Sequence, residues 1–120
     1  QAYDSADNDG ELTTSTYSII RWPYDNGSPS AWGSNCKDNS NYCGFGYTTN
    51  DNDLTGGTSD RFNNSTNYAG FTSSTEAVAD RGNGSWEGEQ DTITYKTSVS
   101  VDQQVEEYNT TITYVCTAQY

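Results

Sequence analysis

Residues 93–101 and 108–118 carry the most regular alternation of hydrophobic and polar positions in the chain. In the first run the odd positions are apolar or Thr and the even positions are polar. In the second run the even positions share a face in the same way, although Val115 makes the other face less polar. A period of two predicts strands with one buried face. The linking residues 102–107 are short enough for a hairpin or for an arch between two sheets.

Earlier segments predict shorter strands. Residues 12–22 are rich in Thr, Ile and aromatic residues and predict a strand that ends at Pro23. The dipeptide Asn26-Gly27 tolerates positive φ and predicts a tight turn. Glycine alternates with larger residues in 42–49, so we expect a short strand with a bulge or with another backbone packed closely against it.

The middle of the chain is mostly polar. Residues 50–67 predict a long surface loop held by two large apolar side chains, Leu54 and Phe62. Residues 68–72 predict a short strand, and 76–79 predict either a strand or one helical turn. No segment has the spacing of a long amphipathic helix.

These patterns define one domain. Residues 1–11 are acidic and without periodicity, so they are expected to form an N-terminal arm, and residues 12–120 a single domain. Short strands followed by two long alternating strands are typical of antiparallel sheets, since parallel strands need intervening helices. We expect an all-β fold, an antiparallel Ig-like β-sandwich with long polar loops.

Composition limits the partners. Only 31% of the 120 residues are hydrophobic, and ten Tyr, three Trp and three Phe supply much of this, so the core is expected to be aromatic. Seventeen acidic residues face five basic ones, a net charge of −12, which disfavours nucleic acid and anionic membranes. No apolar run is long enough to insert the chain into a membrane.

The last fifteen residues, EEYNTTITYVCTAQY, alternate Thr, Ile and Tyr along the final strand. This segment resembles the C-terminal strand of bacterial and archaeal Ig-like surface domains and of fimbrial subunits similar to spore coat protein U. The resemblance implies an extracellular sandwich used in appendages, where the N-terminal arm of one subunit completes the sheet of the next. Residues 12–20 lack the strict apolar alternation that such a donor strand prefers.

The three cysteines favour an oxidising compartment. The chain starts at Gln1 and has no Met, so we expect secretion after removal of a signal peptide. Cys36 and Cys43 enclose six polar residues and are predicted to form a disulfide-bonded loop. Cys116 shares a predicted inward face with Ile112 and is then expected to be a small buried side chain. A bridge from Cys116 to another subunit, or to Cys36 or Cys43, is the alternative.

Catalysis is not expected. The chain has no histidine, which removes the usual general base and the commonest metal ligand. Carboxylate pairs of the kind that glycosidases use occur at Glu87/Glu89 and Glu106/Glu107, but nothing places either pair in a pocket, so we interpret them as surface charges.

No cofactor is predicted. Three cysteines without histidine do not make a structural zinc site. Structural calcium is the alternative, because residues 7–9 and 51–53 (Asp-Asn-Asp) concentrate oxygen ligands in turns. The EF-hand spacing fails: with Gly56 as its glycine, the twelfth position is Phe62 instead of Glu.

Two kinds of surface feature suggest partners. Trp22, Trp32 and Trp86 are candidates for stacking on sugar rings, although filling a thin core is the favoured interpretation. The glycosylation candidates are Asn63, Asn64, Asn83 and Asn109. A further sequon at Asn26 is weakened by Pro29.

The sequence therefore predicts a structural subunit of an extracellular filament or cell-surface assembly. Its partner would be further copies of itself, joined through the N-terminal arm and strand edges. The alternative is a secreted carbohydrate-binding or adhesive module that uses exposed aromatic residues.

Overall fold

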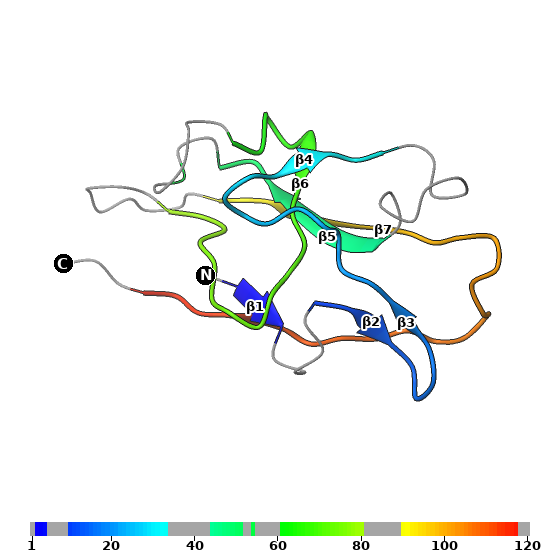
Figure 1. Ribbon diagram of the computed structural model, residues 1–120. Coiled ribbons are helices and arrows are strands. Elements are labelled where there is room, and N and C mark those ends of the chain that lie inside the picture. Colours follow the sequence, from blue (N-terminus) through cyan, green and yellow to red (C-terminus); the bar gives the residue numbers. More distant parts are fainter. Residues whose placement is uncertain are drawn as a thin grey trace.

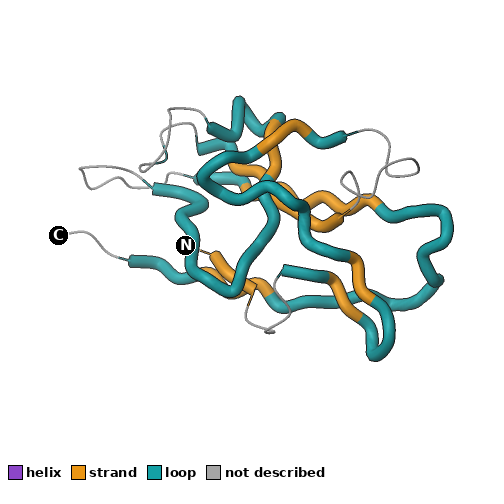
Figure 2. The backbone as a smooth tube through the Cα atoms, in the orientation of Figure 1, coloured by secondary structure: helices purple, strands orange, loops and turns teal. Residues whose placement is uncertain are grey.

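The computed structural model describes residues 2–4, 10–33, 44–51, 54, 61–80 and 90–117, and over these ranges the fold is all-β without a helix (Figures 1 and 2). Its strands are β1 (Ala2–Asp4), β2 (Leu12–Thr13), β3 (Ser18–Ile19), β4 (Ser30–Ala31), β5 (Gly44–Thr49), β6 (Asn67–Tyr68), β7 (Ile93–Ser98) and β8 (Ile112–Tyr114). The prediction of an all-β chain is confirmed.

The strands pair in antiparallel twos: β1 with β8, β2 with β3, β4 with β6, and β5 with β7. Strands β4 to β7 form one group, and β1, β2, β3 and β8 form another (Figure 1). Backbone hydrogen bonds between Thr13 and Asn109 connect the β2–β3 hairpin to the segment that leads into β8. Partly buried Leu12 of β2 and Ile112 of β8 pack against the core cluster, so side chains from both groups meet in the interior.

Strand β5 lies at the centre, and all six of its residues are buried. One edge pairs with β7 over six residue pairs. The other edge is shared by two segments, through a parallel bridge from Arg21 to Phe45 and an antiparallel bridge from Ala69 to Tyr47. The close backbone approach predicted from the glycines is confirmed at Gly46, where an added Cβ would lie 2.7 Å from the Ala69 carbonyl oxygen and 2.9 Å from Trp22 Cβ.

The two faces of β5 pack differently. On one face Phe45 and Tyr47 join the core cluster, which also contains Leu54, Phe62, Ala69, Phe71 and Val78. On the other face Gly46 leaves room for Trp22, which is completely buried. Leu54 and Phe62 are 4% and 1% exposed, so their predicted role as anchors of the polar loop is confirmed.

The single strand predicted for residues 12–22 is wrong. The segment folds back as the β2–β3 hairpin, because the Thr14 hydroxyl accepts the backbone N–H groups of Thr16 (3.1 Å) and Tyr17 (2.9 Å). Such local bonds from Thr compete with an extended ladder.

The helical turn considered for residues 76–79 does not form. The predicted turn at Asn26-Gly27 is present.

The two C-terminal strands are shorter than the alternation predicted. Beyond Ser98 the chain leaves β5, so Val99 is 46% and Val101 79% exposed. Because β7 and β8 belong to different sheets, residues 102–107 form an arch and not a hairpin. Cys116 lies beyond β8 and is exposed, so the expectation that it is buried is wrong.

Part of the segment predicted as an N-terminal arm is paired within the chain, as β1 against β8. Gly10 then anchors the chain at a buried position with φ of 79°. A Cβ there would lie 2.0 Å from the Phe71 carbonyl oxygen, so only glycine fits both the conformation and the space.

Gly46→Ala should destabilise the fold by about 1–3 kcal/mol or more, because the atoms that crowd the new methyl group belong to backbone and to buried Trp22. Urea unfolding followed by fluorescence measures the change. Gly27→Ala is the matched control, since its Cβ would lie 3.5 Å from the nearest contact, Asp25 Oδ1, and the cost should stay within about 0.5 kcal/mol. Equal losses in both variants would contradict the close packing at Gly46.

Candidate functional site

A tight turn directs Asn26 into the protein. The backbone N–H of Ser28 donates to Asp25 Oδ1 (2.9 Å) and, more weakly, to the Asp25 carbonyl oxygen (3.2 Å). This arrangement is the local bond by which Asp closes turns. Asp25 and Ser28 stay exposed, whereas the side chain of Asn26 between them is buried.

Buried Asn26 links side chains from distant segments into a polar cluster of Asn26, Tyr47, Arg61 and Glu76. Its Nδ2 donates to Tyr47 Oη (2.6 Å) and to the Ala77 carbonyl oxygen (2.9 Å). Its Oδ1 accepts from Arg61 Nη2 (2.6 Å). Tyr47 Oη donates in turn to Glu76 Oε2 (3.4 Å). The cluster therefore connects the 25–28 turn to β5, to the 61–66 turns and to residues 76–77.

The electrostatics of the cluster favour neutral forms of its acids. Burial raises the pKa of Tyr47 far above its ordinary value, despite the hydrogen bond from Asn26. Burial also raises the pKa of Glu76 from its ordinary 4.5, and the charge of Asp25 adds to this, while Tyr47, Arg21 and Arg61 oppose it. A tyrosine in this state is a poor base or nucleophile. What the hydrogen bonds of the cluster show is a connection between four segments of the chain.

Arg61 carries the buried positive charge of the cluster. Its Nη1 donates to the Leu54 carbonyl oxygen (3.4 Å), and its guanidinium lies 5.6 Å from the centroid of the Phe62 ring. Nearby, buried Asp51 accepts the backbone N–H of Asp80 at 2.6 Å. These contacts hold polar segments against the core.

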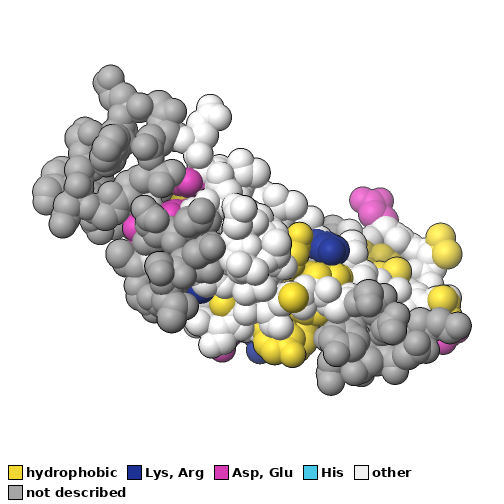
Figure 3. Space-filling model, turned by 90° about the horizontal axis from the view of Figure 1, so that it is seen from above, with side chains coloured by type: hydrophobic (Ala, Val, Ile, Leu, Met, Phe, Trp, Pro, Cys, Tyr) yellow, Lys and Arg dark blue, Asp and Glu magenta, His cyan; other side chains and the backbone are white. Residues whose placement is uncertain are grey.

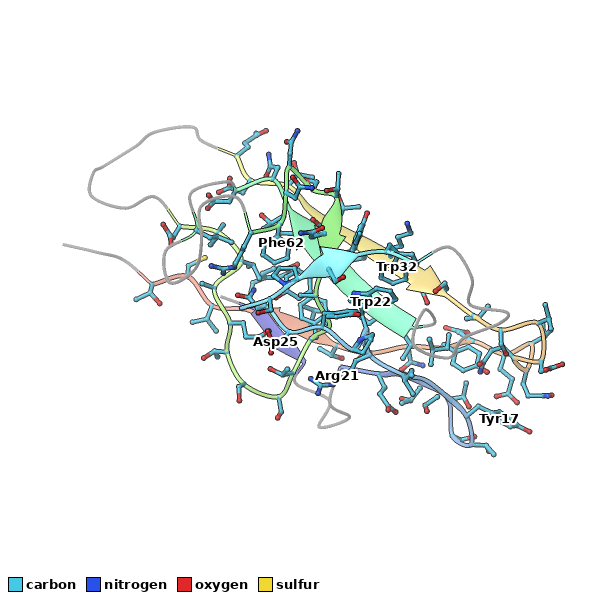
Figure 4. All side chains as sticks on the ribbon, turned by 45° about the horizontal axis from the view of Figure 1, so that its top comes forward. Tyr17, Arg21, Trp22, Asp25, Trp32 and Phe62 are labelled. Carbon is cyan, nitrogen blue, oxygen red and sulfur yellow. The ribbon has the colours of Figure 1, made fainter. Side chains whose placement is uncertain are left out.

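A second group of side chains, the aromatic surface cluster, comprises Trp32, Tyr68 and Lys96. Trp32 stacks on buried Trp22 with ring centroids 4.1 Å apart (Figure 4), and Tyr68 meets Trp32 edge to face at 5.1 Å. Lys96 Nζ lies 5.1 Å from the Trp32 centroid and 5.2 Å from that of Tyr68. Viewed from above, hydrophobic side chains gather around a basic group on this face (Figure 3).

The aromatic platform that the sequence offered as the less favoured interpretation is therefore only partly present, and Trp22 fills the core instead. Trp22 is completely buried and cannot contact a ligand, because it fills the space over Gly46. Trp32 is half-buried, with Trp22 stacked on one face and Lys96 lying over the ring. Trp86 lies outside the described residues.

Several of the other predicted site residues cannot be placed in the fold, among them positions 52–53 of the 51–53 calcium candidate, which lie outside the described residues. Cys36, Cys43, Asn83, Glu87 and Glu89 lie outside the described residues, as does the 7–9 segment. Asn63, Asn64 and Asn109 are exposed, and so are Glu106 and Glu107. The sequon at Asn26 is inaccessible, because its amide is buried and hydrogen-bonded.

Within the part of the chain that the structure describes, no three acidic or cysteine side chains are placed to hold a metal ion. Over the same residues, no helix is long and apolar enough to cross a membrane.

Sequence reasoning missed the polar cluster. Asn26, Tyr47, Arg61 and Glu76 are separated by up to fifty residues and form no motif. One feature of the sequence pointed to the cluster: Arg61 directly precedes Phe62, the apolar anchor of the predicted loop. A charged residue next to a buried one needs polar partners near the core.

Comparison with known proteins found no matching family model, and no curated protein or solved structure with significant similarity to the chain.

Glu76→Gln should raise the free energy of unfolding at pH 7, because it removes a carboxylate whose charged form is disfavoured by burial. A raised pKa in the folded state means that stability falls as pH rises from 4.5 through the folded pKa. The free energies of unfolding of wild type and variant should therefore agree at about pH 3, where the carboxyl group is protonated in both the folded and the unfolded state, and diverge at higher pH.

Urea unfolding between pH 3 and 8 measures this difference. Exposed Glu107→Gln is the matched control and should follow wild type throughout. A Glu76→Gln variant that is less stable than wild type at pH 7 would show that the ionised carboxylate stabilises the cluster.

Proposed function

We propose that this protein is a structural subunit of an extracellular filament or cell-surface assembly, joined to further copies through its N-terminal strand and strand edges. The observation that carries the proposal is the attachment of β1. Among the described residues, it pairs with β8 at the other end of the chain through three residue pairs.

We envisage exchange of strand β1 between copies. The chain is anchored at buried Gly10, so the nine residues before it are the part that could leave. Fully extended, nine residues reach about 30 Å. Pairing of β1 with β8 of a neighbour would restore the same hydrogen bonds, which is the basis of strand swapping.

Shape and surface support an assembly. The molecule measures 49 × 27 × 22 Å and has a radius of gyration of 15.1 Å. A compact chain of this length is expected to have a radius of gyration of about 14 Å. Tyr114 and Val115, at and just after β8, are 47% and 39% exposed, although both are apolar. Contacts with a neighbour would cover this surface.

The proposal extends to finer features of the fold and its setting. The two groups of sheets would be the layers of an Ig-like sandwich, with the aromatic core between them. Secretion would permit a Cys36–Cys43 disulfide and glycans at exposed sequons such as Asn64 and Asn109.

Deleting residues 1–9 should abolish concentration-dependent polymers while leaving a folded protein, since the core residues that the structure describes all lie after Gly10. Electron microscopy and sedimentation of wild type and variant test this. Added salt should favour wild-type polymers, because each copy has a net charge of −12. A peptide of residues 1–9 should block wild-type growth, and a scrambled peptide should not. Wild type that stays monomeric at millimolar concentration would overturn the proposal.

A second candidate is carbohydrate binding, and the aromatic surface cluster is what favours it. Trp32 and Tyr68 are partly exposed and stand at 74° to each other, which would offer an apolar wall to a sugar ring. Because Lys96 lies over both rings, a sugar would have to displace it or contact its ammonium group.

If sugars bind there, tryptophan fluorescence should respond to glycans in a saturable way, and Tyr68→Ala should weaken binding about tenfold or more. Exposed Tyr17→Ala is the matched control, because Tyr17 lies at the tip of the β2–β3 hairpin (Figure 4). No response to neutral or acidic glycans would remove this candidate.

A further inference from the structure

The outer edge of β7 offers a second surface for self-association. Strand β7 pairs with β5 on one edge, and no described residue pairs with its other edge. With six residues it equals β5 as the longest described strand, but β5 is buried whereas the middle of β7 is exposed. A long open edge is a template for another strand.

Hydrogen bonding in β5 shows which groups of β7 point outward. Phe45 donates to the Ile20 carbonyl oxygen and accepts from Trp22 N–H, on the side away from β7. Tyr47 exchanges bonds with Ala69 on that same side. Because successive residues of a strand face opposite edges, Gly44, Gly46 and Thr48 are the β5 residues that face β7.

The register then orients β7. Gly46 is paired with Lys96, and Thr48 with Thr94, so the even residues of β7 direct their backbone groups to β5. The odd residues Ile93, Tyr95 and Thr97 therefore direct their N–H and C=O groups to the open edge. Three residues at this spacing are what an added antiparallel strand requires.

Charge also favours an approach at this edge. Residues 92–101 contain no acidic residue in a chain with seventeen, and their only charge is Lys96. Two copies of net charge −12 repel least where such segments meet. An edge lysine normally guards against pairing, but Lys96 Nζ lies over Trp32 and Tyr68 on one face of the sheet.

We infer that β7 pairs antiparallel with β7 of a second copy, with Tyr95 on the two-fold axis. Ile93 then lies opposite Thr97 of the other copy, and Lys96 opposite Thr94, so no like charges face each other directly. The pairing covers the exposed part of Tyr95, which is 44% exposed while its ring stacks on Phe45 and meets Phe71 at a tilt. This inference rests on the proposed assembly function for its biological purpose, but not for its geometry.

The first test is Thr97→Pro. Proline removes an N–H that points to the open edge and spares the bonds of Lys96 and Thr94 to β5. The dissociation constant of the dimer, measured by sedimentation, should rise about tenfold or more. Thr97→Ala is the matched control, because it keeps the N–H and should dimerise as wild type does.

The second test is crosslinking, which does not depend on the stability of a proline variant. In a Cys116→Ser background, Tyr95→Cys should form a disulfide-linked dimer, since facing Cα atoms across the axis lie about 5.5 Å apart. Thr94→Cys should not, because its two copies would be offset by two residues and lie about 8 Å apart.

The outcomes separate this inference from the proposed function. Polymers that Thr97→Pro leaves intact, with no crosslink at position 95, would overturn β7 pairing and keep the assembly function. Dimers that crosslink at position 95 in a protein that never polymerises would support β7 pairing and overturn the assembly function. Dimerisation should also survive deletion of residues 1–9.

Discussion

Trp22 packs against Gly46 with no room for a side chain between them, and the rest of the structure is arranged around this contact. The missing side chain lets the 20–22 segment and Ala69 reach the same edge of β5, while Phe45 and Tyr47 face the main core. A chain with 31% hydrophobic residues thus buries one strand completely. Large aromatic side chains make this feasible, because each removes much apolar area from water.

Buried polar residues add hydrogen bonds to the packing of the small apolar core. Asn26, Tyr47 and Arg61 are all buried. Asn26 donates to Tyr47 and accepts from Arg61, each time through a hydrogen bond of 2.6 Å. A buried polar group is costly without a partner, so this cluster links distant segments in one arrangement. Burial raises the pKa values of Tyr47 and Glu76, because it disfavours their charged forms.

The two proposed contacts are complementary. Pairing of β7 with β7 of a second copy uses the same surface on both subunits, so this contact is complete in a dimer. Exchange of β1 onto β8 of a neighbour is a second contact at a separate strand pair. Alternation of the two would extend dimers into a filament, whereas either contact by itself need not. The net charge of −12 opposes both contacts, and the segment free of acidic residues around β7 reduces this repulsion.

The sequence by itself determined the features that depend on local pattern: an all-β chain, a close approach at the glycines of β5, a turn at Asn26-Gly27, and anchors at Leu54 and Phe62. Tertiary structure decided where strand β7 ends. A strand needs a pairing partner, and the pairing with β5 stops at Ser98, so Val101 is exposed although it continues the alternation. The folding back of residues 12–22 depends on local bonds to the Thr14 hydroxyl, which alternation does not reveal. Tertiary structure also decided the polar cluster, because hydrogen bonds between residues far apart in sequence leave no periodic trace.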